Sequence, residues 1–345
     1  MLILKLQKKD KMRLSTRVIL LLSRQDDGST REVAEWLFAL QKNFIRLNAD
    51  DKKNRFLNCD IQAHKFTFLF NNKPCTFLVS DIKSAWFRRS GFSKESLVDG
   101  KGLNNLFHKP SFFASEHLKE EAQEIFEFIY YLLQSKPQLK NIGNPFYNAV
   151  NKLIVLNLAR SLGLKIPLTH IVSSKKELKT FTKKNTRLIT KSIGNGVYRF
   201  TDEYGYYSYT ERVTPEFIDT LPDNYFPSLV QGEIVKKYEL RIFYLERKFY
   251  SMAIFSGEFE ATAIDNRKNF ETPSLPRRVP YLLPKSIEKY LSLLMKKLKL
   301  NTGSIDMIVT REKEFYFLEV NPIGQFGMVS EPCNYYLEKK IAQAL

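Results

Sequence analysis

Cysteine is scarce in this chain of 345 residues, which contains only Cys59, Cys75 and Cys333. Three cysteines cannot build a dense disulfide scaffold. No Cys-x-x-Cys pair or cysteine–histidine cluster has the spacing of a zinc site, and the four histidines are scattered along the sequence. Cysteine usage therefore predicts a reducing, cytoplasmic environment and no structural zinc.

Long hydrophobic runs are also missing. The longest, such as residues 18–22 and 125–133, fall far short of the roughly 20 apolar residues that cross a bilayer. Residues 1–15 carry charge but no apolar signal region. We therefore expect neither a membrane-spanning protein nor a secreted one.

Several familiar site motifs do not occur. The sequence has no G-x-x-x-x-G-K-[ST] phosphate loop and no G-x-G-x-x-G dinucleotide fingerprint. It also has no G-x-S-x-G nucleophile elbow and no H-R-D or D-F-G kinase motif. These absences argue against P-loop, dinucleotide-binding, α/β-hydrolase and protein-kinase chemistry.

Positive charge is abundant. Lysine and arginine together number 54 against 37 aspartates and glutamates, which gives a formal net charge of +17. Such a surface attracts polyanions or acidic peptides. The basic residues are spread along the chain and mostly form pairs, which is also typical of a plain solvated surface. Nucleic acid binding therefore remains an alternative that the charge alone does not favour.

The first part of the chain has an α/β pattern. Hydrophobic residues make up 43% of the sequence, enough for a normal core. Residues 17–22 predict a strand, Ser29 caps a predicted helix, and residues 44–47 predict a second strand, which together form a βαβ unit. Residues 64–70 and 75–80 predict a hairpin.

Helices and then strands follow. Residues 115–134 predict a long helix, and the Pro- and Gly-containing stretch 136–145 predicts a boundary. The next helix has its apolar face predicted at Val150, Leu153, Ile154 and Leu158 and ends near Gly163. Beyond it the pattern predicts strands at 187–191, 197–200, 206–211, 240–245 and 248–254, a helix at 287–298, and a hairpin of 304–309 with 315–320.

The predicted C-terminal hairpin carries the most informative polar residues. Glu319 and Asn321 are two residues apart on one strand and therefore project to the same side. If the hairpin pairs, Asp306 on the adjoining strand faces them. Two carboxylates and an amide oxygen form a hard-oxygen site suited to Mg²⁺. The alternative is a solvent-facing polar edge.

Two lysines lie in apolar surroundings. Lys191 ends a predicted strand and precedes a loop with Gly194 and Gly196, so its charge and the backbone N–H groups of the loop can hold phosphates. Lys152 lies in the helix that follows the boundary. A simple β-turn and an exposed lysine would give the same pattern.

The extended stretch 229–235 can offer backbone groups to an adenine edge. Its members Gln231, Glu233 and Ile234 are candidates for nucleotide binding, and Glu233 or Glu239 can bind ribose hydroxyls. Arg241 lies on the next predicted strand, where a guanidinium can pair with phosphate oxygens. An edge strand followed by a polar turn is the alternative explanation.

Taken in order, these motifs resemble the ATP-grasp superfamily of carboxylate–amine ligases. The resemblance covers residues 145–330. Lys152 and the segment 159–169 look like the first lysine helix and its exit, and Lys191 looks like the second lysine with its glycine loop. Residues 231–235 look like the hinge over adenine, and 239–241 like the acidic-x-Arg strand. Asp306, Glu319 and Asn321 look like the metal triad, which implies ATP and Mg²⁺ as cofactors.

A closer resemblance covers nearly the whole chain. Residues 23–30, 86–89 and 317–336 look like the graspetide, microviridin-type peptide ligases, and most like the ATP-grasp peptide maturase of grasp-with-spasm systems. The implied fold is α/β and α+β, with an N-terminal α/β domain (1–115), a helical connection (116–143), a small central subdomain (144–230) and a C-terminal mixed-sheet subdomain (231–345).

The resemblance also implies an activity. Such enzymes activate Asp or Glu side chains of a ribosomally made precursor peptide as acyl phosphates and join them to Ser, Thr or Lys side chains as esters or amides. Arg241 and Arg267 are the expected catalytic residues, and Arg277 and Arg278 are further candidates in the predicted loop 265–278. The resemblance implies a homodimer. It leaves open whether Arg88 and Arg89 bind peptide or support the fold.

Two other functions stay open on the sequence alone. The first is an ATP-grasp ligase that joins small molecules or adds amino acids to a protein end. The second is a basic nucleic-acid-binding protein without catalysis, against which the complete metal triad argues.

Overall fold

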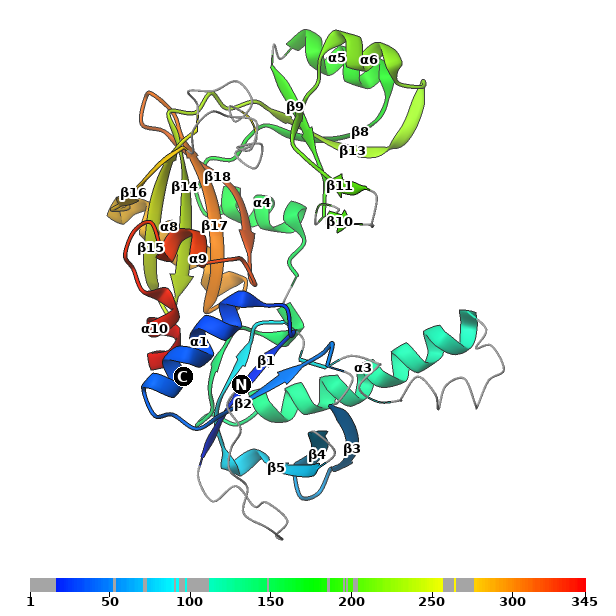
Figure 1. Cartoon of the computed structure of the whole chain (residues 1–345). Coiled ribbons are helices and arrows are strands. Elements are labelled where there is room, and N and C mark those ends of the chain that lie inside the picture. Colours follow the sequence, from blue (N-terminus) through cyan, green and yellow to red (C-terminus); the bar gives the residue numbers. More distant parts are fainter. Residues whose placement is uncertain are drawn as a thin grey trace. The chain divides into compact units, whose positions relative to one another are not determined.

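A computed structural model of the chain describes residues 17–51, 54–70, 73–89, 91–92, 97, 112–147, 149–184, 187–194, 196, 198–200, 204–256, 264 and 276–345. The chain divides into two units, Met1–Asn148 with Tyr336–Leu345, and Ala149–Tyr335. Figure 1 shows the helices and strands of both units along the sequence.

A parallel sheet of order β2-β1-β6-β7 forms the centre of the first unit. Its strands are β1 (Val18–Ser23), β2 (Phe44–Asn48), β6 (Ile82–Phe87) and β7 (Lys140–Ile142). All of β1 is buried, as expected for a central strand covered on both faces. With α1 (Gly28–Ala39) between β1 and β2, the predicted βαβ unit is confirmed.

The start of α1 differs from the sequence prediction. The N-cap is Asp27 and not Ser29, and Asp27 makes no side-chain capping hydrogen bond. Its carboxylate instead accepts hydrogen bonds from Thr30 and Arg88. The Ser29 prediction was wrong because a buried ion pair engages the residue before the helix, which a local capping pattern does not reveal.

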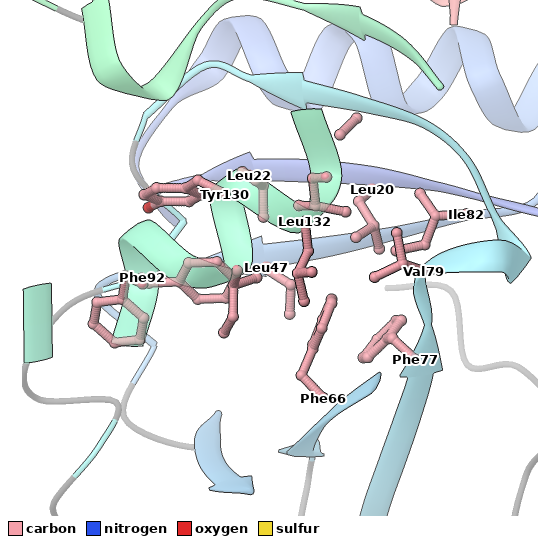
Figure 2. Packing of buried hydrophobic residues seen from close by; sticks show 14 of the residues in the cluster. Leu20, Leu22, Leu47, Phe66, Phe77, Val79, Ile82, Phe92, Tyr130 and Leu132 are labelled. Carbon is pink, nitrogen blue, oxygen red and sulfur yellow. The ribbon is translucent and has the colours of Figure 1, made fainter. Parts of the chain in front are cut away.

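The predicted hairpin forms β4 (Lys65–Phe70) and β5 (Lys73–Leu78), and β3 (Arg55–Asp60) adds an unpredicted third strand to this antiparallel sheet. A 3₁₀ turn (Val79–Asp81) leads to β6, and α3 (Phe112–Gln134) matches the predicted long helix. Figure 2 shows side chains of β1, the hairpin and α3 packed into one hydrophobic core. The C-terminal helix α10 (Leu337–Ala344) packs on α1.

The first helix of the second unit is α4 (Lys152–Ser161). The unit contains a four-stranded sheet of order β12-β9-β13-β8. The strands are β8 (Thr169–Ser174), β9 (Leu188–Lys191), β12 (Glu211–Arg212) and β13 (Asn224–Gly232). Its core includes side chains of α5 (Lys175–Lys184) and α6 (Pro215–Thr220). The predicted strand 206–211 is wrong, since β11 (Gly205–Tyr207) pairs with β10 (Tyr198–Phe200) while β12 pairs with β9.

An antiparallel sheet of order β16-β15-β14-β17-β18 completes this unit. The strands are β14 (Tyr238–Leu245), β15 (Lys248–Phe255), β16 (Arg277–Tyr281), β17 (Thr302–Val309) and β18 (Phe315–Asn321). α4 and α8 (Lys285–Lys297) share one core with this sheet. The short helix α9 (Gly327–Ser330) contacts β14 and β15.

The apolar face predicted for α4 is correct only in part. Val150 and Leu158 pack partly buried against the core, but the buried residues are Val155, Leu156 and Ala159, and Ile154 is 57% exposed. The prediction therefore set the centre of the stripe incorrectly. In the observed phase Lys152 lies three, four and seven positions before the buried residues and therefore on their side of the helix.

Among the residues that the structure describes, no helix is long and apolar enough to cross a membrane. Cys59, Cys75 and Cys333 are free thiols.

Candidate active site

A row of charged side chains crosses the five-stranded sheet. Arg241 on β14 pairs in register with Asp306 on β17, and Asp306 pairs with Glu319 on β18. The neighbours Ile242 and Ile305 lie in the core, so alternation places Arg241 and Asp306 on the opposite face. Residues directly opposite on neighbouring strands have Cβ atoms about 5 Å apart, so the three side chains form one group.

A β-bulge brings Glu319 into this row. Met307 pairs with Phe317, but Asp306 pairs with Glu319, so Leu318 is the extra residue. Without the bulge Leu318 would lie opposite Asp306. Bulges of this kind re-aim side chains near functional sites, and here the shift places two carboxylates side by side.

Arg241 holds Asp306 with both arms of its guanidinium. Nε donates to Oδ1 and Nη2 donates to Oδ2, each over 2.8 Å. This planar, two-bond geometry is the strong form of a charge-assisted contact. The negative charge of Asp306 raises the pKa of Arg241, which stays protonated.

Lys152 connects Glu319 to the start of α4. Its Nζ lies 3.1 Å from Glu319 Oε2 and donates to the Ser192 carbonyl oxygen over 3.1 Å. The Asn151 side chain caps the helix by accepting from the backbone N–H groups of Leu153 and Ile154. The cap therefore fixes the position from which Lys152 reaches the carboxylate.

The two carboxylates have opposite pKa shifts. Burial raises the pKa of Asp306, and the nearby charges of Glu319 and Glu239 raise it further against the opposing effect of Arg241. Burial also acts to raise the pKa of Glu319, but Lys152 and Lys191 outweigh it and lower the net value. A bound cation would offset both the burial of the Asp306 carboxylate and its repulsion by Glu319.

These residues fit a magnesium site. Asn321 ends β18 two residues beyond Glu319, opposite Ser304, and its Oδ1 accepts from the Ile323 N–H. Within the described ranges no three His, Cys, Asp or Glu side chains gather as a ready-made metal site. Mg²⁺ characteristically takes one or two protein carboxylates and completes its shell with phosphates and water. Asp306, Glu319 and the Asn321 amide oxygen match that donor set.

Lys191 and Glu239 lie beside the charged row. Lys191 ends β9 and is close enough to lower the pKa of Glu319. Glu239 precedes Arg241 by two residues on β14, so both point to the same face. Its carboxylate forms an ion pair with Lys236 and accepts a hydrogen bond from Ser256 over 3.1 Å.

The predicted adenine-binding residues lie at the end of β13. Gln231 is buried, and its Nε2 donates to Thr169 Oγ1 over 2.8 Å, while its Oε1 has no partner among the described residues. Glu233 accepts two hydrogen bonds from Arg212, and its backbone N–H donates to the Arg187 carbonyl oxygen. Ile234 follows β13 and is half-buried.

The predicted basic loop is only partly described. Arg267 lies outside the described residues. Arg277 and Arg278 are not in a loop but begin β16, paired with Phe255 and Ile254. The sequence stretch was read as a loop because its prolines and the absence of alternation hide a short strand.

Sequence reasoning missed the partners of the charged residues. It assigned Arg241 to phosphate but not to Asp306, because that contact joins residues 65 positions apart through the pairing of β14 with β17. In the first unit it missed the buried pair of Asp27 and Arg88, whose Oδ2 and Nε lie 3.1 Å apart. That pair favours the structural alternative for Arg88.

A four-stranded and a five-stranded sheet, a lysine-bearing helix that precedes both sheets in sequence, and a row of acidic and basic side chains on one face of the five-stranded sheet are typical of the ATP-grasp fold. Comparison with solved structures confirms this class. An ATP-grasp ligase from Chryseobacterium gregarium, RiPP-associated and in complex with ADP and a leader and core peptide, is 26% identical over 95% of each chain, with a TM-score of 0.75.

The macrocyclase MdnC of Microcystis aeruginosa, bound with its precursor peptide MdnA, is also 26% identical. The match covers 96% of this chain and 99% of MdnC with a TM-score of 0.72. D-alanyl-alanine synthetase A of Vibrio cholerae shares the fold at 14% identity, with a TM-score of 0.55 over 96% and 98% of the two chains. No protein-family model and no curated protein sequence matches the chain.

Proposed function

We propose that this protein is an ATP-dependent peptide ligase that cross-links side chains of a ribosomally made precursor peptide. The observation that carries the proposal is the row Arg241, Asp306 and Glu319 on one sheet face, joined by Lys152 of α4, so that two carboxylates and two cations meet. The ligase from C. gregarium and MdnC, which share the fold over nearly the whole chain, are both in complex with peptides.

An acidic peptide fits the charge of this chain. The formal net charge of +17 favours an anionic partner and speeds its encounter with the protein. A carboxylate on the peptide is also the group that ATP can activate. The proposed partner therefore carries Asp or Glu residues together with Ser, Thr or Lys residues as nucleophiles.

In the first step a peptide carboxylate oxygen attacks the γ-phosphorus of ATP, which forms an acyl phosphate and releases ADP. Lys152, Lys191, Arg241 and Arg267 offset the negative charge that gathers on the phosphate oxygens. Mg²⁺ held by Asp306, Glu319 and Asn321 would supply Lewis-acid neutralisation of phosphate charge. Gln231, Glu233, Ile234 and Glu239 would hold the nucleotide.

In the second step a hydroxyl or amine of the same peptide attacks the acyl carbon and releases phosphate, which leaves an ester or an amide. The attacking group loses one proton, so each cross-link removes the elements of one water from the peptide. The protein's contribution here is to orient the two side chains and to keep water away from the acyl phosphate.

The proposal also covers organisation and location. It divides the chain at residues 115, 143 and 230 into an N-terminal domain, a connection and two ATP-grasp subdomains, and it includes a homodimer. The three free thiols support a cytoplasmic location.

The test is an ADP-release assay with full-length protein, ATP and Mg²⁺. We expect release to depend on an acidic precursor peptide encoded near the gene. Release stimulated by free amino acids without any peptide would instead indicate a small-molecule ligase. Tight, steeply salt-dependent binding of DNA or RNA without ADP release would overturn the proposal in favour of a nucleic-acid-binding protein.

A further inference from the structure

Arg278 on β16 lies on the same sheet face as the charged row. Glu239 pairs with Ile254, and Ile254 pairs with Arg278, so these three residues lie in line across β14, β15 and β16. Directly opposite residues of an antiparallel sheet point to the same face. Glu239 and Arg241 share that face as well, since they are two residues apart on β14.

Arg277 provides the contrast. It precedes Arg278 by one residue and therefore points to the opposite face. Its guanidinium lies 5.6 Å from the ring centroid of Phe255, which packs against the sheet core. Two adjacent arginines of equal charge thus face opposite sides of one strand.

The Arg278 guanidinium has an unused donor. Its Nε is buried and has no hydrogen-bond partner among the described residues. Arg241 and Lys152, in contrast, already bind Asp306 and Glu319. A buried donor without a partner is costly and rare in proteins, and an anion that accepts from it would remove that cost.

The position of Arg278 separates it from the reacting phosphate. β15 and β14 lie between β16 and β17, as the sheet order and Figure 1 show. Arg278 is aligned through Ile254 and Glu239 with Ile308 on β17, two residues from Asp306. Three strand spacings and this offset place the backbones of Arg278 and Asp306 about 16 Å apart. An extended peptide covers this distance in about five residues. A group bound at Arg278 is therefore not the group that reacts beside Asp306.

We propose that Arg278 binds a second carboxylate of the peptide, about five residues from the one that is activated. The guanidinium fork matches a planar carboxylate, as the bidentate pair of Arg241 and Asp306 illustrates in this protein. This inference rests on the proposed peptide ligase function. It makes Arg278 a determinant of peptide choice and not of ATP binding.

The first experiment compares Arg278→Gln with Arg277→Gln in full-length protein. Both lose one positive charge at neighbouring positions, so long-range attraction of the peptide changes equally. With the precursor peptide that wild-type protein converts, we expect Arg278→Gln to raise the peptide KM about tenfold, as for loss of a charge-assisted contact. The KM for ATP should stay constant, and Arg277→Gln should resemble wild type. Equal peptide KM values for both variants, or a raised KM for ATP, would overturn the inference.

Peptide variants locate the second carboxylate. Each Asp and Glu of the peptide is replaced singly by Asn or Gln and assayed with wild type and Arg278→Gln. One replacement, about five residues from the cross-linked position in an extended segment, should weaken binding to wild type and have no further effect in Arg278→Gln. Fully additive effects at every position would contradict the contact.

A binding assay separates failure of this inference from failure of the proposed function. If wild-type protein converts no peptide, the ligase proposal fails on its own. Fluorescence anisotropy with a labelled oligoglutamate peptide still tests Arg278. A dissociation constant about fivefold weaker for Arg278→Gln alone supports a carboxylate site, and equal constants for both variants refute it.

Discussion

Among single residues, Glu319 is central to the candidate site, because it lies opposite Asp306 and forms an ion pair with Lys152. We predict that Glu319→Gln lowers kcat at least about a hundredfold, since it removes one negative donor of the proposed metal site. Peptide binding, measured by anisotropy, should change little. Glu314→Gln is the matched control, because among the described residues the Glu314 side chain forms a surface ion pair with Lys165 and a hydrogen bond with Tyr316. Unchanged product formation in Glu319→Gln would refute the metal assignment.

A second residue-level prediction concerns the buried pair of Asp27 and Arg88 in the first unit. Arg88 is only 4% exposed, so Arg88→Met leaves the Asp27 carboxylate buried without its cation. We expect a loss of about 3–5 kcal/mol in the free energy of unfolding at pH 7. Arg24→Met, which breaks an exposed pair with Asp26, should cost less than about 1 kcal/mol. Trp36 and Trp86 both lie in this unit, so their fluorescence follows its urea unfolding.

The same pair predicts a dependence on pH. Burial acts to raise the pKa of Asp27, but Arg88, Thr30 and Arg89 outweigh it, so the net pKa is lowered. A lowered pKa stabilises the folded state above the unfolded-state value of about 3.9, and this stabilisation is lost as the pH falls through the folded value. The difference in stability between wild type and Arg88→Met should therefore shrink below about pH 4. A difference that stays constant down to that pH would contradict the ion pair.

At the scale of elements, the N-cap of α4 positions Lys152, a residue of the candidate site. Asn151→Ala should lower the free energy of unfolding by about 1 kcal/mol. It should also lower kcat several-fold, because the backbone of Lys152, the first helical residue, is no longer held in place by the cap. Thr214→Ala is the control, since Thr214 caps α6 in the same unit through a hydrogen bond to the Phe217 N–H. Thr214→Ala should lower the free energy of unfolding by a similar amount, as measured by circular dichroism, and leave kcat unchanged. Equal kinetic losses in both variants would show that the effect is general destabilisation.

The sequence predicts some helices and strands well and others poorly. Apolar runs and hydrophobic periodicity predicted β1, α3 and the two hairpins, because each is a local pattern that burial on one or both faces imposes. They predicted the buried face of α4 only in part, since the phase of a helix depends on what it packs against. Strand β3 and the short edge strand β16 lack a clear local pattern.

The sequence predicts which residues form the candidate site but not their contacts. Strand alternation and family resemblance propose Asp306, Glu319 and Asn321, and the structure pairs Asp306 with Glu319. That Glu319 faces Asp306 depends on the bulge at Leu318, which changes the register by one residue and leaves no sequence signal. The contacts of Arg241 with Asp306 and of Lys152 with Glu319 depend on long-range pairing, so only the folded chain reveals them.

At the scale of the whole molecule, the net charge of +17 predicts salt-sensitive kinetics. Raising the NaCl concentration from about 50 mM to about 300 mM shortens the screening length, so kcat/KM for the acidic peptide should fall severalfold while kcat changes little. A peptide whose non-reacting carboxylates are changed to Gln or Asn should show a shallower fall. A kcat/KM that is insensitive to salt for both peptides would contradict electrostatic steering.

The most direct measurement is mass spectrometry of the acidic precursor peptide after incubation with full-length protein, ATP and Mg²⁺. The account predicts a loss of the mass of one or more waters that depends on ATP, with fragmentation joining an Asp or Glu side chain to a Ser, Thr or Lys side chain. Glu319→Gln should give no such product. A peptide of unchanged mass, recovered while wild-type protein hydrolyses ATP in its presence, would contradict the proposed cross-linking activity.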